Sequence, residues 1–136
     1  EQDQGARLPF AVVDTRTGFA VGTTSYLDIQ PSNRSLEIGW TWLGAAARRT
    51  AINTQCKYLL LRHAFDSLGA VRVCLKTDAR NQRSQRAILR LGARYEGCLR
   101  RSRVLQSGYI RDTIHYSILD REWPGVKSRL ELMLTR

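Results

Sequence analysis

The sequence has few cysteines, and their placement argues against two common classes of small domain. There are three, Cys56, Cys74 and Cys98, far apart inside apolar segments, with no CxxC pair and no histidine at a metal-binding spacing. An odd number in such positions argues against a disulfide framework and against a zinc site. We therefore expect reduced, buried thiols, no bound metal and a cytoplasmic location.

Long hydrophobic runs are also missing. No stretch approaches the roughly 20 apolar residues of a membrane-spanning helix, and the first residues, EQDQGAR, are too polar for a secretory signal peptide. No internal repeat or low-complexity linker divides the chain. With 136 residues, 43% hydrophobic and 25% charged, the composition is typical of one globular domain. We expect a single domain over residues 1–136.

Acidic residues are scarce relative to basic ones. Asp and Glu total 12 against 22 Lys and Arg, which gives a formal net charge of +10 at neutral pH. Such a surplus favours an anionic partner, such as nucleic acid, the ribosome surface or a polyphosphate cofactor. A basic surface without any partner fits equally well, because net charge reports on association and not on fold.

The hydrophobic periodicity predicts strands, a helix, a strand, a helix and two strands, in that order, with a helix at the end. This order is typical of a mixed α/β (α+β) fold with a partly antiparallel sheet. Asn53 or Thr54 is expected to cap the first helix and Asn81 the second, and the strand period puts Trp40 or Trp42 in the core. We expect strands at 8–13, 19–29, 36–43, 71–77, 94–105 and 111–119, and helices from 53 to 68, 81 to 92 and 126 to 134.

The segment from Leu36 to Leu68 carries the main indication of a binding site. A strand leads through a loop of small and basic residues directly into a long amphipathic helix. The first turn of a helix presents unpaired N–H groups and a partial positive charge, which together bind phosphate. Arg48 and Arg49 add charge there, unless they are solvated surface residues. The segment predicts a site for a phosphate-bearing cofactor.

Six sequence segments match one family and occur in the order typical of it: LPFAVVD, LEIGWTWL, NTQCKYLLLRHAF, KTDARNQRSQRAILRLGA, EGCLR and RDTIHYSILDREWP. They cover about residues 8–124. Through them the chain resembles the GCN5-related N-acetyltransferases (GNAT superfamily), in the RimJ/RimL-type branch of ribosomal-protein N-acetyltransferase-like enzymes. The resemblance implies a twisted, mostly antiparallel sheet flanked by helices. It also implies a splayed strand pair that holds acetyl-CoA.

Carried across by position, the resemblance assigns a set of residues to coenzyme A. Backbone groups of four consecutive residues would contact the pantetheine arm: Trp40, Thr41, Trp42 and Leu43. The family's pyrophosphate loop, Gln/Arg-x-x-Gly-x-Gly/Ala, falls on residues 48–53. The phosphates would accordingly be held by Arg48 and by the amides of Arg49, Thr50, Ala51, Ile52, Asn53 and Thr54. Asn81 would hydrogen-bond the pantetheine arm, and Ser84 would lie near the sulfur.

The chain departs from the family pattern in three places. Ala51 stands where glycine is usual, so either cofactor affinity is lowered or this loop does not need a positive φ. Ile88 stands where many members carry a tyrosine that acts as a general acid. The family's first strand and helical pair have no room before Leu8, so we expect an N-terminally truncated domain. An uncovered sheet edge would then invite pairing into a homodimer.

Acetyl transfer to an amine requires a base for the ammonium, stabilisation of the oxyanion and a proton for the leaving thiolate. Glu37 is the candidate base, directly or through water, because burial can raise the pKa of a lone carboxylate. The alternatives are a solvent-facing Glu37 or one paired with a nearby Arg. Ser84 is the candidate for protonating the thiolate, or it only supports the Asn81 cap.

We therefore expect an acetyl-CoA-dependent N-acetyltransferase in which a bound amine attacks the thioester directly. The acceptor would be a protein N-terminus or a small-molecule amine. One alternative is a basic nucleic-acid- or ribosome-binding module without catalysis, although the basic runs hold few aromatic residues and no usual RNA-binding signature. Another alternative is a coenzyme A-binding GNAT fold with weak turnover.

Overall fold

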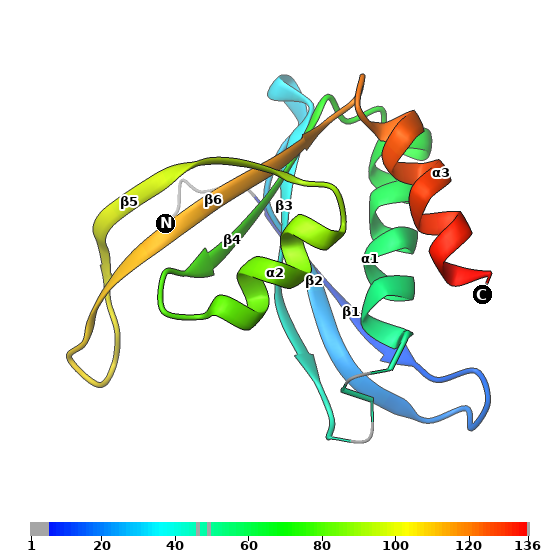
Figure 1. Cartoon of the computed structure of the whole chain (residues 1–136), viewed down its shortest axis with the longest axis horizontal. Coiled ribbons are helices and arrows are strands. Elements are labelled where there is room, and N and C mark those ends of the chain that lie inside the picture. The colour runs from blue at the N-terminus through cyan, green and yellow to red at the C-terminus, as the bar shows by residue number, and fades with distance from the viewer. Residues whose placement is uncertain (1–5, 46, 49, 136) are drawn as a thin grey trace.

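The protein is a six-stranded sheet with three helices, described by a computed structural model over residues 6–45, 47–48 and 50–135 (Figure 1). The strand order across the sheet is β1-β2-β3-β4-β6-β5. The strands are β1 (Ala6–Val13), β2 (Ala20–Gln30), β3 (Ser35–Leu43), β4 (Arg72–Asp78), β5 (Arg94–Val104) and β6 (Ile110–Leu119). The helices are α1 (Ile52–Arg62), which continues as a π-helical turn over His63–Ser67, α2 (Gln82–Arg90) and α3 (Trp123–Leu134).

One strand pair in this sheet separates partway along its length. β3 and β4 are its parallel pair, and they are registered only from Ser35 with Arg72 to Glu37 with Cys74. Beyond that point both strands continue, to Leu43 and Asp78, and Figure 1 shows them diverging. The other neighbouring pairs are antiparallel. The predicted mostly antiparallel sheet with a splayed strand pair is therefore confirmed.

The hydrophobic core lies on one face of the sheet, against all three helices. Strand alternation explains this: Val73 and Leu75 of β4 point into the core, whereas Cys74 and Lys76 point to the other face. Leu61 of α1 and Leu130 of α3 are fully buried, and each such side chain contributes about 1.5–3 kcal/mol to stability. The helices and the core are thus confined to one side, and the second face carries polar groups.

The predicted strands and helices are all present, with shifted ends at two helices. α1 begins at Ile52 and not at Asn53 or Thr54, because Thr50 Oγ1 accepts the Ile52 N–H at 3.2 Å and neither predicted residue caps the helix. α3 begins at Trp123, before the predicted start, since proline suits a first helical turn. The predicted Asn81 cap of α2 is confirmed: its Oδ1 accepts the Ser84 N–H at 3.0 Å.

Two predictions about burial are wrong. Trp40 and Trp42 are 57% and 59% exposed, so neither belongs to the core. The reason is a break in the strand alternation at Trp40, whose φ is +49°. Cys98 is exposed on the edge strand β5, whereas Cys56 and Cys74 are half-buried, and all three are free thiols.

Among the described helices, none is both long and apolar enough to cross a membrane.

Candidate active site

A groove of about 730 Å³ opens where β3 and β4 separate. Its walls come from the end of β3, the loop that enters α1, the first turns of α1 and the start of α2. It collects most of the residues predicted to hold a cofactor: Trp40, Thr41, Trp42, Leu43, Arg48, Thr50, Asn53, Thr54, Asn81 and Ser84. Ala51, Ile52 and Glu37 do not line it, and Arg49 lies outside the described residues.

A β-bulge in β3 shapes one wall of the groove. Ser25 of β2 is registered with Gly39 and Thr23 with Trp42, so Trp40 and Thr41 together lie opposite Thr24. An extra residue of this kind bends a strand and changes which face its side chains take. The bulge explains why the predicted alternation of tryptophans fails, and it places Thr41 on the helix-covered face beside α1.

Ala51, the residue directly before α1, has an ordinary helical backbone conformation. Its φ is −70°, so this position does not need the glycine that is usual there. Of the two alternatives for Ala51, the structure supports a loop that does not need a positive φ at this residue. Arg48 is exposed, and its Nε donates to the Leu43 carbonyl at 3.1 Å. The first turn of α1 follows directly, with the N–H groups that such a turn leaves without intrahelical acceptors. This arrangement suits a phosphate group.

Asn53 provides a test of whether the groove fits a ligand. Its side-chain Oδ1 is buried and has no hydrogen-bond partner among the described residues. A buried acceptor without a partner costs about 1–3 kcal/mol, and Asn53 lines the groove. A ligand with an N–H or O–H group at this position would remove the cost. The residues present therefore fit coenzyme A, which offers both phosphates and amide N–H groups.

The start of α2 contributes the other end of the groove. Because Asn81 Oδ1 accepts the Ser84 N–H, the cap places both side chains at the groove wall. Ser84 is half-buried. Ile88, one turn further, is buried and also lines the groove, so this position offers no hydroxyl. Ser84 is accordingly the side-chain hydroxyl that α2 presents to the groove.

Lys57 is a groove residue that was not predicted from the sequence. Its side chain is 8% exposed, and its Nζ donates to Thr41 Oγ1 at 2.8 Å. Thr41 Oγ1 in turn shares a hydrogen bond with Thr24 Oγ1 at 2.9 Å. Burial lowers the pKa of Lys57 to about 8. A signal was available, because a lysine four residues before Leu61 falls on the apolar face of α1.

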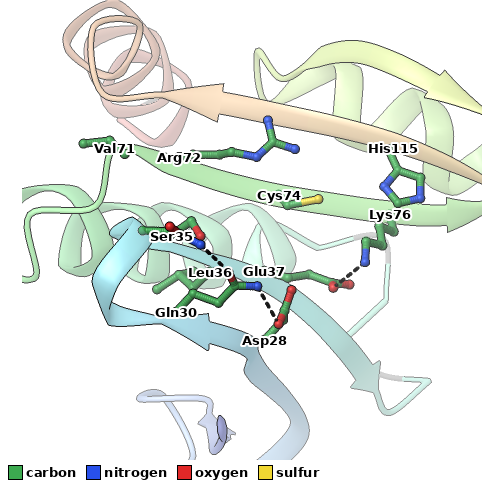
Figure 2. Close-up of a pocket in the computed structure, with 11 residues that line it drawn as sticks. Asp28, Gln30, Ser35, Leu36, Glu37, Val71, Arg72, Cys74, Lys76 and His115 are labelled. Carbon is green, nitrogen blue, oxygen red and sulfur yellow. Dashed lines mark hydrogen bonds and ion pairs between the residues drawn. The ribbon is translucent and has the colours of Figure 1, made fainter. Parts of the chain in front are cut away.

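Glu37 lies in a second cavity, of about 420 Å³, on the sheet face opposite the helices (Figure 2). Its Oε1 is 3.1 Å from Lys76 Nζ, and its side chain is 15% exposed. Figure 2 shows this pair beside His115, whose pKa is lowered by burial and then by the charge of Lys76. Of the alternatives for Glu37, pairing with a cation is what the structure shows, although the cation is Lys76 and not an arginine.

The two cavities meet at the gap between β3 and β4. Lys76 lines both of them. Gly39 lines the groove, and a Cβ placed there would lie 3.2 Å from Glu37 Oε2. The predicted base is thus separated from Ser84 by the sheet, but its second oxygen, Oε2, lies beside a residue that borders the groove. Chemically, the site combines a helix start beside Arg48, a polar groove and a carboxylate at the gap.

Comparisons with known proteins point to one family. The family described as "Acetyltransferase (GNAT) domain" matches residues 1–94. A provisionally named ribosomal N-acetyltransferase, YdaF of Bacillus subtilis, is 31% identical over 81% of this chain and 59% of its own length. The ribosomal-protein-serine acetyltransferase of Escherichia coli is 29% identical over 75% of this chain and 56% of its own. The chain therefore spans less than two thirds of these relatives.

Solved structures agree with this assignment. The crystal structure of a GCN5-related N-acetyltransferase from Brucella melitensis superposes with a TM-score of 0.90 at 34% identity. The match covers 98% of this chain and 59% of that one. A provisionally named acetyltransferase from T. thermophilus gives a TM-score of 0.87 at 43% identity, over 97% of this chain and 69% of that one. Sequence and architecture thus identify the same family.

Proposed function

The chain belongs to the GNAT acetyltransferase family, and from that premise we propose that it is an acetyl-CoA-dependent N-acetyltransferase. The acceptor is an amine, of a protein N-terminus or of a small molecule, and it attacks the thioester directly. The observation that carries the proposal is the groove at the β3–β4 separation, which joins the first turn of α1 to the start of α2. Acetyl-CoA supplies the activated acetyl group, and the residues of the chain bind and orient it.

The proposed binding mode follows the groove from end to end. Arg48 and the backbone amides from Thr50 to Thr54, except that of Ile52, which donates to Thr50 Oγ1, hold the phosphates at the start of α1, where the helix dipole favours negative charge. Backbone groups of residues 40–43 follow the pantetheine arm, and a backbone N–H near Trp42 or Leu43 meets the thioester oxygen. Asn81 contacts the arm from α2. The lining of the groove by these segments supports this placement.

Glu37 is the proposed base at the gap between the strands. Lys76 holds Oε1 at 3.1 Å, which leaves Oε2 beside Gly39 to take a proton from the acceptor ammonium, directly or through one water. The acceptor amine then enters from the sheet face opposite the helices, where Glu37 lines its cavity. Ser84 donates a proton to the leaving sulfur from the α2 side. The separate roles of Glu37 and Ser84 agree with their positions on opposite sides of the sheet.

The test is an acetylation assay on the wild-type chain and two variants. Release of the coenzyme A thiol is followed with acetyl-CoA and a panel of N-terminal peptides and small amines. Loss of a general base lowers kcat by about 10²- to 10⁴-fold, which is the effect expected for Glu37→Gln. Glu131→Gln, which removes a carboxylate of α3 that lines neither cavity, should leave kcat unchanged.

The outcomes separate the candidate functions. Unchanged kcat in Glu37→Gln would remove Glu37 from the mechanism. Acetyl-CoA binding without turnover of any amine would favour the alternative of a coenzyme A-binding fold with weak turnover. Failure to bind acetyl-CoA at millimolar concentration would contradict the proposal as a whole.

A second candidate function rests on the basic β5–β6 hairpin. Arg100, Arg101 and Arg103 are all exposed on β5, and they add to a chain with a net charge of +10. A ribosomal or other acidic partner would be attracted to this strand. Its signature would be RNA binding that weakens steeply with salt, together with indifference to coenzyme A. The proposed acetyltransferase would instead bind acetyl-CoA whether or not RNA is present.

A further inference from the structure

Lys57 is a buried cation in the groove with an incomplete set of partners. Its side chain is 8% exposed, and one of its three N–H donors is used by Thr41 Oγ1 at 2.8 Å. No carboxylate of the described residues forms an ion pair with it. Burying an ammonium group without an anion is costly unless other hydrogen bonds compensate. Two donors of Lys57 are thus available for a ligand.

Asn53 lies on the same face of α1, four residues before Lys57. Residues at this spacing are neighbours on a helix surface, with Cβ atoms about 5–6 Å apart. Asn53 Oδ1 is a buried acceptor without a partner in the described structure, and both side chains line the groove. The helix therefore presents an unsatisfied acceptor and an unsatisfied donor side by side.

The surroundings of Lys57 are short of negative charge. The other charged residues that line the groove are all basic: Arg48, Lys76, Arg83 and Arg90. Cys56, next to Lys57 on the same helix, acts on the Lys57 charge, and Tyr26 of β2 donates its hydroxyl to the Leu60 carbonyl of that helix. Burial raises the pKa of both groups, so both are neutral at pH 7. A ligand in the groove can therefore supply the polar partner that no described residue gives Lys57.

We propose that Lys57 and Asn53 bind an amide group of the pantetheine arm of acetyl-CoA. The ammonium group of Lys57 donates to the amide oxygen, and Asn53 Oδ1 accepts the amide N–H. Thr41 supports this choice of ligand group, because it anchors Lys57 and belongs to the stretch of β3 that faces the arm in the proposed function. The inference rests on that function, and it concerns binding and not the acetyl transfer step.

The experiment compares two ligands that differ in the arm. Dissociation constants are measured by calorimetry for acetyl-CoA and for 3′-phosphoadenosine 5′-diphosphate, which retains the nucleotide and phosphates but has no pantetheine. Lys57→Met should weaken acetyl-CoA binding about tenfold, the typical effect of one hydrogen bond to a charged group. The affinity for the arm-less ligand should stay unchanged. Lys127→Met, which removes the same charge from a lysine paired with Asp66 outside the groove, is the matched control.

The pH dependence gives a second readout. The pKa of the unliganded Lys57 is lowered to about 8 by burial, so its donor is strongest below that pH. The affinity of the wild-type chain for acetyl-CoA should fall between pH 7 and 10, whereas that of Lys57→Met should change less. If Lys57→Met does not fold, Asn53→Ala tests the same site with the same two ligands.

The results test the proposed role of Lys57 and Asn53 separately from the proposed function on which it rests. A wild-type chain that binds neither ligand would contradict the proposed function. Binding of both ligands with no loss of acetyl-CoA affinity in either variant would overturn the inference alone. Equal losses for the two ligands would also overturn it, because Lys57 would then act on the phosphates and not on the arm.

Discussion

At the scale of single residues, Lys57 places a charged ammonium group in an apolar, buried environment. It occupies the face of α1 that Leu60, Leu61 and Ala64 fill with buried apolar side chains. Its ammonium group is nevertheless kept inside by Thr41, and burial lowers its pKa to about 8 from the ordinary 10.5. Residues that reduce stability in this way are common at ligand sites, where the binding partner compensates for them.

The effect of Lys57 on stability can be measured without any ligand. Between pH 8 and 10.5 the unfolded chain binds more protons at this lysine than the folded one, so the free energy of unfolding rises with pH in that window. Below pH 8 the full penalty applies. Lys57→Met should therefore stabilise the fold at pH 7 by on the order of 2 kcal/mol.

Urea denaturation at several pH values from 7 to 10 tests this prediction. The advantage of Lys57→Met over the wild type should shrink as the pH rises above 8. A variant that is less stable than the wild type at pH 7 would show that the Thr41 hydrogen bond outweighs the cost of burial.

At the scale of elements, the β2–β3 pair determines the shape of the groove. Just beyond the bulge at Trp40 and Thr41, the two strands approach closely at Gly22. A Cβ at Gly22 would lie 2.1 Å from the Trp42 carbonyl oxygen and 2.8 Å from Leu43 Cδ2. Backbone atoms cannot move aside cheaply, so only glycine fits this position. The approach places Trp42 and Leu43 at the groove wall.

Gly22→Ala should separate the two strands locally. We expect a loss of about 2 kcal/mol or more in the free energy of unfolding, as overpacking typically causes. Acetyl-CoA affinity should fall with it. Gly125→Ala is the matched control, because a Cβ at Gly125 meets nothing within 4 Å. It lies within α3, where alanine is favoured over glycine by about 0.5–1 kcal/mol. Equal stabilities of the two variants, measured in urea, would contradict the prediction.

At the scale of the whole molecule, ion pairs between acids and the excess of basic residues shape the response to pH. Glu96 of β5 accepts hydrogen bonds from Arg72 of β4 and Ser117 of β6, which connects three strands. The Arg72 guanidinium lowers the pKa of Glu96 to about 2. Arg80 similarly lowers the pKa of Asp78 to about 2. These carboxylates stabilise the fold only while they are ionised.

The fold should accordingly lose stability in acid. Glu96 binds fewer protons when folded than when unfolded, so its contribution is complete above its ordinary pKa of 4.5 and disappears as the pH falls to about 2. Repulsion within a chain whose net charge is already +10 adds to the loss. Melting temperatures from pH 6 to pH 2 should therefore fall.

Glu96→Gln should melt lower than the wild type at pH 6, and its melting temperature should fall less steeply with acid. Glu131→Gln removes a carboxylate that forms no ion pair in the described structure, and the glutamine oxygen can still accept the hydrogen bond from the Tyr58 hydroxyl, so this variant should follow a curve parallel to the wild type. Parallel curves for all three proteins would show that ionised Glu96 does not contribute to the acid dependence of stability.

Much of this architecture could be predicted because it depends on local patterns. The strand and helix order followed from periodicity, and the Asn81 cap from the preference of asparagine for that position. The groove-lining residues of the α1 loop followed from the resemblance to a family whose pyrophosphate loop falls on residues 48–53. The resemblance also implied the split between β3 and β4, which the register now shows.

What the sequence determined by itself was the set of elements and the strand–loop–helix segment that leads into α1, since periods, caps and helix ends involve residues a few positions apart. Only the tertiary structure decided which side chains share a cavity. It placed Glu37 with Lys76 on one face of the sheet and Lys57 with Thr41 on the other. The physical reason is that the face a strand residue takes depends on bulges and strand separation, which arise from pairing between segments distant in the chain.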